Sequence, residues 1–149
     1  MGGFFGVAGS DEKTCVSDLF FGTDYQSHLG TQRGGLAVKG KDGFTRVIHD
    51  ITNAQFRSKF DSDISDMRGW HGIGCISDYE DQPILVRSHL GTYAIVTVGV
   101  VQNAAALAKA AFKKRHTHFA EMAGNEVNPT ELVATLINEE DSFAAGLES

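Results

Sequence analysis

The pattern of hydrophobic and polar positions predicts strands and helices in an irregular order. Phe4 to Ala8 predict a buried strand that begins almost at the first residue. Apolar residues near helical spacing then predict a helix over about 13–28. Extended runs follow over 35–38 and 44–51, joined by a turn at 41–43, because Asp-Gly between extended runs is a strong hairpin signal.

The middle of the chain contains three further apolar runs after a polar segment. That segment, 55–67, has spaced apolar residues and fits either a short helix or an irregular excursion. The runs over 72–76, 84–90 and 92–101 predict three strands, and Gly91 joins the last two as a hairpin. The predicted strands therefore follow one another with short connections.

Two helices complete the predicted pattern. The segment 103–114 is rich in alanine, leucine and lysine, which are strong helix formers. A second helix is expected over about 129–139, with Asn128 as its N-cap and Pro129 at its first position. Because strands and helices do not alternate regularly, the pattern disfavours a doubly wound parallel sheet. It favours an α+β fold of antiparallel sheets with helices on their outer faces.

Composition and charge narrow the classes of partner. The 149 residues are 42% hydrophobic and 21% charged, which is ordinary for one globular domain. A net charge of −6 disfavours nucleic acid, and the basic run 113–115 is interpreted as the cation-rich end of a helix. No apolar stretch is long enough to span a membrane and no signal-peptide pattern is present, so we expect no membrane association and a cytoplasmic location.

A few histidines and cysteines are candidate metal ligands. His71, Cys75 and His89 lie near one another in the sequence, but they lack the spacing of a known metal motif. His116 and His118 form a His-x-His pair, for which a helix-terminal role is the favoured interpretation. We therefore expect no metal and no cofactor, and Cys75 is interpreted as a small core residue. Residue chemistry alone names no reaction, since no nucleophile elbow or phosphate-binding loop is present.

Several short segments, most of them containing glycine, carry a resemblance to a known family. They are MGGFFGVAG at the start, Ser27-His28-Leu29-Gly30, Gly35-Leu36-Ala37-Val38, Gly72-Ile73-Gly74-Cys75-Ile76-Ser77, Gln82-Pro83, the run from Gly91 to Gly99, and Asn128-Pro129-Thr130-Glu131. In this order and over essentially the whole chain, they resemble the class II glutamine amidotransferases. The spacing is most similar to the glutaminase half of the amidophosphoribosyltransferases of purine biosynthesis.

The resemblance implies a fold and a reaction. The family fold is a four-layer αββα sandwich of two antiparallel sheets, like that of the N-terminal nucleophile hydrolases. In the family, the first mature residue is a cysteine that attacks the glutamine amide while its own α-amino group acts as the base. Here Gly2 occupies that position. A glycine has no side chain, so no covalent acyl intermediate can form there.

Other functional positions also depart from the family pattern. The arginine that holds the substrate carboxylate is replaced by Ser77, and the arginine of the Gln-His-Arg-Gly segment by Leu29. The oxyanion-hole asparagine is replaced by Val98, while its neighbour Gly99 is kept. The aspartate that binds the substrate amine aligns with Pro129. The resemblance thus places the substrate pocket at His28, Ser77, Asp78, Gly99 and Pro129.

These departures predict a folded domain that does not hydrolyse glutamine. The leading hypothesis is a structural or regulatory part of a phosphoribosyltransferase domain or subunit. One alternative is a non-catalytic module that binds a small, glutamine-like metabolite. Another is an active amidotransferase with a relocated nucleophile, such as Cys75 assisted by His71 or His28. We expect one domain over 1–149 that is shorter than the family's and lacks a phosphoribosyl-pyrophosphate signature, as a fragment of a longer protein or a minimal stand-alone relative would be. In a stand-alone relative, missing strands would leave an open sheet edge, which favours a homo-oligomer.

Overall fold

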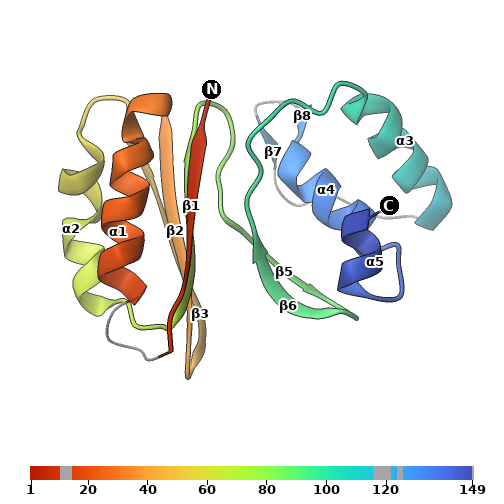
Figure 1. Cartoon of the computed structure of the whole chain (residues 1–149). Coiled ribbons are helices and arrows are strands. Elements are labelled where there is room, and N and C mark those ends of the chain that lie inside the picture. Colours follow the sequence, from red (N-terminus) through yellow and green to blue (C-terminus); the bar gives the residue numbers. More distant parts are fainter. Residues whose placement is uncertain (11–14, 116–121, 124–125, 149) are drawn as a thin grey trace.

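The first half of the chain forms a four-stranded antiparallel sheet with helices on one face (Figure 1). The computed structural model describes residues 1–10, 15–115, 122–123 and 126–148. In spatial order the strands are β1 (Gly3–Ala8), β4 (His71–Ser77), β2 (Arg33–Gly40) and β3 (Gly43–Asp50). The helices are α1 (Cys15–Tyr25), which continues into the 3₁₀ turn η1 (Gln26–Leu29), and α2 (Phe56–Asp66).

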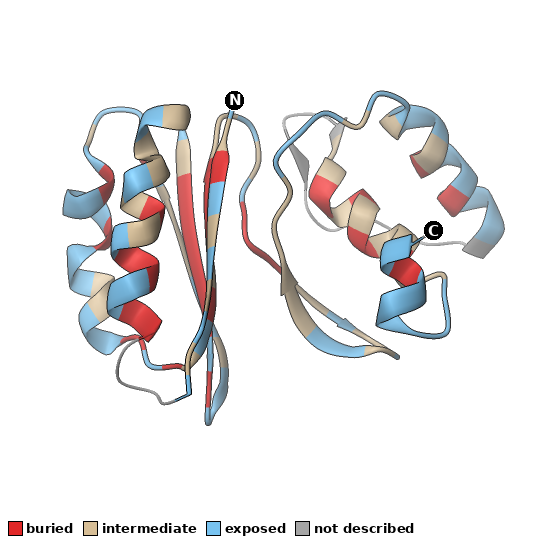
Figure 2. Cartoon of the chain, in the orientation of Figure 1, coloured by how far each residue is buried: buried red, intermediate tan, exposed pale blue. Residues whose placement is uncertain are grey.

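The main core lies between this sheet and its two helices, where Figure 2 shows the buried residues facing the sheet. Leu36 and Val38 of β2 are fully buried against Leu19 of α1 and Phe60 of α2. Phe60 stacks on Phe56, with ring centroids 4.4 Å apart. Because side chains alternate along a strand, the other face of β2 carries Arg33, Gly35, Ala37 and Lys39.

The second half of the chain adds a two-stranded sheet and three helices. They are β5 (Ile84–Ser88), β6 (Gly91–Ile95), α3 (Ala104–Arg115), α4 (Pro129–Ile137) and α5 (Phe143–Glu148), with a short pair β7 (Met122–Ala123) and β8 (Glu126–Val127). The Tyr93 hydroxyl donates to the Asn138 side chain at 3.0 Å, and its ring packs on Phe143. These contacts hold α4 and α5 against the hairpin, so the layers run helices, sheet, sheet, helices (Figure 1).

This architecture confirms the predicted fold class of two antiparallel sheets with helices on the outside. Both hairpins have two-residue turns, at 41–42 and 89–90. Of the two interpretations of 55–67, the helix is correct, since α2 occupies most of it. Asn128 caps α4 as expected, because its side chain accepts from the Thr130 backbone N–H at 2.9 Å.

Three sequence expectations are corrected by the structure. Phe4 is 59% exposed, because Phe5 and Val7 take the helix-covered face of β1 and Phe4 points to the opposite face. The strand expected over 92–101 ends at Ile95, and the strand expected over 84–90 ends at Ser88, where the turn begins. Helix α5 and the β7–β8 pair were not predicted, since such short segments carry no clear periodicity.

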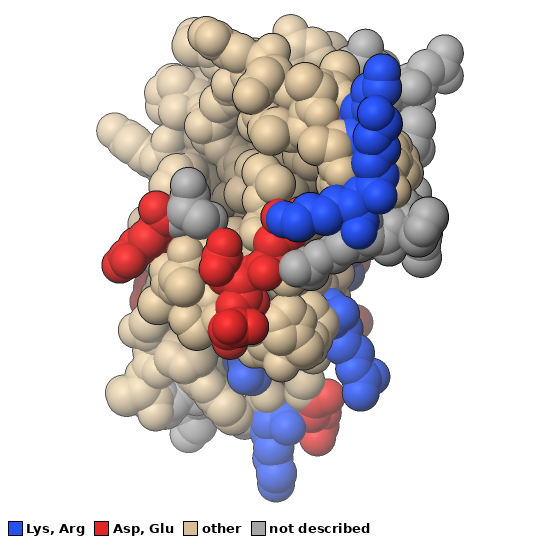
Figure 3. Space-filling view, turned by 90° about the vertical axis from the view of Figure 1, so that its right-hand side faces the viewer, with Lys and Arg blue, Asp and Glu red and all other residues tan. Residues whose placement is uncertain are grey.

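The basic run after the alanine-rich segment does close a helix. Lys114, in the last turn of α3, pairs with Glu139 at 2.9 Å, so basic and acidic side chains lie side by side on that face (Figure 3). A surface of mixed sign does not attract phosphates as a uniformly basic one would. Within the described residues, no helix is long and apolar enough to cross a membrane.

Candidate functional site

A cavity of about 370 Å³ lies beside the N-terminus, between the end of β4 and the segment after β6. Five residues that the sequence assigned to functional positions line this cavity, namely Gly2, Ser77, Asp78, Val98 and Gly99. They come from three separate parts of the chain. Antiparallel pairing of β1 with β4 places Gly3 opposite Ile76, which brings the first residues beside the turn after β4.

The backbone of Gly2 lies closely against β4. A Cβ atom built at Gly2 would lie 2.5 Å from the carbonyl oxygen of Ile76, closer than real Cβ contacts allow. The obstructing atom belongs to the backbone of a buried strand, so it cannot rotate aside as a side chain can. Position 2 therefore accommodates glycine, and a larger residue requires the N-terminal segment to shift.

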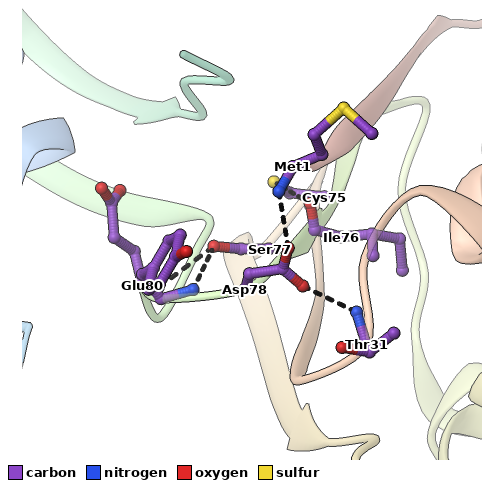
Figure 4. Close-up of polar contacts among 8 residues, drawn as sticks. Met1, Thr31, Cys75, Ile76, Ser77, Asp78 and Glu80 are labelled. Carbon is purple, nitrogen blue, oxygen red and sulfur yellow. Dashed lines mark hydrogen bonds and ion pairs between the residues drawn. The ribbon is translucent and has the colours of Figure 1, made fainter. Parts of the chain in front are cut away.

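Ser77 closes the turn that follows β4. Its hydroxyl oxygen accepts from the backbone N–H groups of Tyr79 at 3.3 Å and Glu80 at 3.1 Å (Figure 4). This is a local side-chain-to-backbone contact of the kind that stabilises turns. The serine at the expected arginine position thus shapes the cavity wall and supplies no positive charge to it.

Asp78 fastens the N-terminus to the loop that follows α1 and η1. Its carboxylate accepts from the Met1 ammonium at 2.6 Å and from the Thr31 backbone N–H at 2.8 Å (Figure 4). These two hydrogen bonds, the ammonium's first, lower the pKa of Asp78. These contacts favour the ionised carboxylate, which holds two distant segments together.

Asp78 gives a pH-dependent contribution to stability whose sign follows from the lowered pKa. The contribution is fully present above the ordinary aspartate pKa of about 3.9 and is lost as the pH falls through the folded-state pKa. We expect Asp78→Asn to lower the urea midpoint at pH 6, and the gap from wild type to shrink as the pH approaches 3. A gap that stays constant with pH would contradict this role. Asp61→Asn, at an exposed site on α2, is the matched control.

A buried polar network forms the floor of the cavity. Gln82 is only 3% exposed. Its side-chain carbonyl accepts a hydrogen bond from the Thr97 backbone N–H at 2.7 Å. Its side-chain NH₂ group donates to the Thr97 backbone carbonyl at 3.0 Å and to the Glu80 carboxylate at 2.8 Å. Glu80 also accepts from the Thr130 hydroxyl at 2.6 Å. The network joins the turn after β4, the segment after β6 and the first turn of α4.

Val98 and Gly99 form the far wall of the cavity. Val98 presents an apolar side chain where an amide donor is expected. Gly99 has a φ of 155°, a conformation that residues with side chains rarely adopt. The backbone geometry around the expected oxyanion position thus depends on glycine, while the side-chain donor is absent.

Two of the expected pocket residues lie outside this cavity. His28 is exposed in η1, and its Nδ1 donates to the Tyr25 carbonyl at 2.8 Å. Pro129 begins α4 and does not line the cavity, although its neighbour Thr130 reaches the network beneath it. The sequence does not assign Glu80, Gln82, Thr97 or Thr130 to the site, although the last three lie within segments that carry the resemblance.

Cys75 and the histidines do not form a second centre in the described residues. Cys75 is 1% exposed, as expected of a core residue, and burial followed by the Glu80 charge raises its pKa to about 12. A thiol with that pKa is not ionised at neutral pH and is a poor nucleophile. His89 donates to the Glu140 carbonyl at the far end of the hairpin. No three metal-ligating side chains meet in the described residues, and His116 and His118 lie outside them.

The fold, two antiparallel sheets with helices on their outer faces, matches that of two solved structures. One matching solved structure is the glutamine phosphoribosylpyrophosphate amidotransferase from B. subtilis complexed with ADP and GMP. It has 21% identity and a TM-score of 0.79 over 99% of this chain and 32% of that chain. Another, the allosteric regulatory enzyme of purine biosynthesis, has 20% identity and a TM-score of 0.79 over 99% of this chain and 33% of that chain.

The chain spans about a third of the length of these two proteins. At this level of identity, the likeness concerns the fold. No family model matches the chain, and no curated protein matches it either.

Proposed function

We propose that this chain is a glutaminase-type domain of the phosphoribosylpyrophosphate amidotransferase kind that no longer hydrolyses glutamine. It serves as a structural or regulatory part of a phosphoribosyltransferase, which then uses free ammonia. The observation that carries the proposal is the position of Gly2 in the cavity wall. Gly2, which the resemblance assigns to the nucleophile position, lines the cavity without a thiol, and a side chain there would require a shift of the backbone.

The rest of the cavity supports the same proposal. Glutamine presents a carboxylate that the family's arginine would pair, whereas here Ser77 caps a turn and the charged side chains lining the cavity are the acids Asp78 and Glu80. Loss of an oxyanion donor, as at Val98, typically lowers the rate about 100- to 1,000-fold. Together these changes disfavour both the binding of glutamine and the chemistry that would follow.

The test is release of glutamate from glutamine, followed with a coupled glutamate dehydrogenase assay. We expect the purified chain to release no glutamate above a blank without protein, while an active amidotransferase gives a clear signal in the same assay. Gly2→Cys is expected to stay inactive, because the new Cβ meets the Ile76 carbonyl and the arginine and asparagine are still missing. Glutamate release above the blank would overturn the proposal.

A Cys75→Ser variant identifies the source of any activity. If glutamate release were observed and Cys75→Ser abolished it, the nucleophile would be relocated to Cys75.

A second experiment tests the proposed role beside a phosphoribosyltransferase. A preparation that contains both this domain and the phosphoribosyltransferase is expected to release pyrophosphate with ammonium chloride and not with glutamine. Equal use of both nitrogen sources would contradict the proposed loss of function.

A second candidate function is a module that senses a small metabolite. The observation in its favour is that the N-terminal cavity persists, at about 370 Å³, although the side chains expected to contact glutamine have changed. That volume lies within the range of small-molecule sites. Calorimetric titration with amino acids and with ADP and GMP separates the two candidates, because a purely structural domain binds none of them.

A further inference from the structure

A second cleft of about 460 Å³ lies between the first sheet and the β5–β6 hairpin, at the opposite end of the strands from the N-terminal cavity. Its walls come from all four strands of the first sheet on one side and from β6 on the other. It shares no lining residue with the N-terminal cavity. Ligand binding in this cleft is therefore independent of the proposed loss of glutamine hydrolysis.

Two small residues of the first sheet, Gly6 and Ala37, leave space in this cleft. Gly6 of β1, Ile73 of β4 and Ala37 of β2 are directly opposite one another across the three strands, so they form one row on the inner face. A Cβ atom at Gly6 would approach no atom closer than Ile73 Cγ2 at 3.9 Å. Across the gap, β6 contributes Ala94. The cleft is thus predominantly apolar and wide enough to admit a small ligand.

Two basic side chains lie together at one end of the cleft. Lys39 of β2 and His71 of β4 are paired in register, so their side chains project from the same face next to one another. Lys39 Nζ lies 5.6 Å from the centroid of the Phe44 ring. Within the described residues, no carboxylate pairs with Lys39 or His71, and no aspartate or glutamate lines the cleft.

An unpaired lysine beside an apolar cleft attracts an anion, and the apolar walls favour a ligand with a hydrocarbon body. We propose that the cleft binds amphiphilic carboxylates, with the carboxylate at Lys39 and His71 and the hydrocarbon chain along Gly6, Ala37 and Ile73. The ligand class is therefore that of medium-chain fatty acids.

The experiment uses decanoate as the probe, below its micelle concentration, in titration calorimetry with the whole chain. Trp70 is the chain's single tryptophan, and its ring centroid lies 6.3 Å from that of His71, so its fluorescence reports on the same end of the cleft. We expect saturable one-to-one binding of decanoate with a change in tryptophan emission. Absence of saturable binding would overturn the proposal.

Two variants separate the charged end from the apolar body. Lys39→Met keeps the length of the side chain and removes its charge, so decanoate is expected to bind about tenfold more weakly or worse. Lys41→Met, in the neighbouring β2–β3 turn, is the matched control and should bind as wild type does. Decan-1-ol, which has no charge, should bind wild type and Lys39→Met equally. Equal decanoate affinity for the two lysine variants would overturn the role of Lys39.

Gly6→Leu tests whether the ligand occupies the cleft. The strand position has open space at Cβ, so the leucine side chain is expected to fill the cleft without displacing the backbone. Circular dichroism of this variant should match wild type, while decanoate binding is lost. A folded Gly6→Leu protein that binds decanoate as wild type does would place the fatty acid elsewhere and overturn the proposal.

Discussion

Gly35→Ala is expected to be among the most damaging single substitutions in the chain. Gly35 is buried in β2, and a Cβ atom there would collide with the backbone carbonyl of Gln82 and lie 2.8 Å from the Pro83 ring. Neither obstructing group can rotate away, because one is backbone and the other a proline ring. Overpacking of this kind typically costs 1–3 kcal/mol and occasionally more. We expect a loss of about 3 kcal/mol in the free energy of unfolding, measured by urea denaturation.

Gly6→Ala is the matched control for this prediction. It also adds one methyl group to a glycine on the inner face of the same sheet, but the nearest atom is 3.9 Å away. Its stability is expected to equal that of wild type or to exceed it slightly, since alanine restricts the unfolded chain. If Gly35→Ala and Gly6→Ala were equally stable, the close contact between β2 and the segment after β4 would not exist in solution.

Local features of the fold could be predicted from the sequence because their causes are local. The β2–β3 turn at 41–42 depends on the local Asp42-Gly43 pair, and α3 depends on a run of strong helix formers. The order of the strands in the sheet has no such local cause, because β1 and β4 are separated by about 60 residues. The sequence also could not predict which face of β1 packs against the helices. Phe4 and Phe5 are chemically identical and differ only in what packs on them.

Only the residues that match family motifs could be assigned to the candidate site from the sequence. The resemblance brought Gly2, Ser77 and Gly99 to one place, and the structure has them around one cavity. It did not predict the polar floor, since Gln82 and Thr97 are joined by hydrogen bonds that leave no periodic trace in the sequence. The resemblance assigns Asp78 to the substrate pocket. In the structure, the Asp78 carboxylate accepts hydrogen bonds from the N-terminal ammonium and from the Thr31 backbone N–H.

The buried amide of Gln82 is expected to be the second most sensitive position. Removing it in Gln82→Ala leaves the N–H and C=O of Thr97 without their partners, and Glu80 loses a donor. An unsatisfied buried group costs about 1–3 kcal/mol. We therefore expect the free energy of unfolding to fall by about 2–3 kcal/mol, with faster hydrogen exchange at the Thr97 amide.

Gln82→Met distinguishes the lost hydrogen bonds from lost packing. Methionine fills a similar volume but offers no strong donor or acceptor, so it is expected to recover less than half of the stability lost in Gln82→Ala, with exchange at Thr97 still fast. Gln55→Ala is the control, because Gln55 is exposed and its side chain makes no capping hydrogen bond to α2. If Gln82→Met were as stable as wild type, packing alone would hold the first sheet to the segment after β6. The cavity floor would then not depend on the polar network.

The expected result is faster hydrogen exchange at the Thr97 amide in both Gln82 variants and slow exchange in Gln55→Ala. That result would show that hydrogen bonds of the Gln82 side chain join the two halves of the molecule at the site.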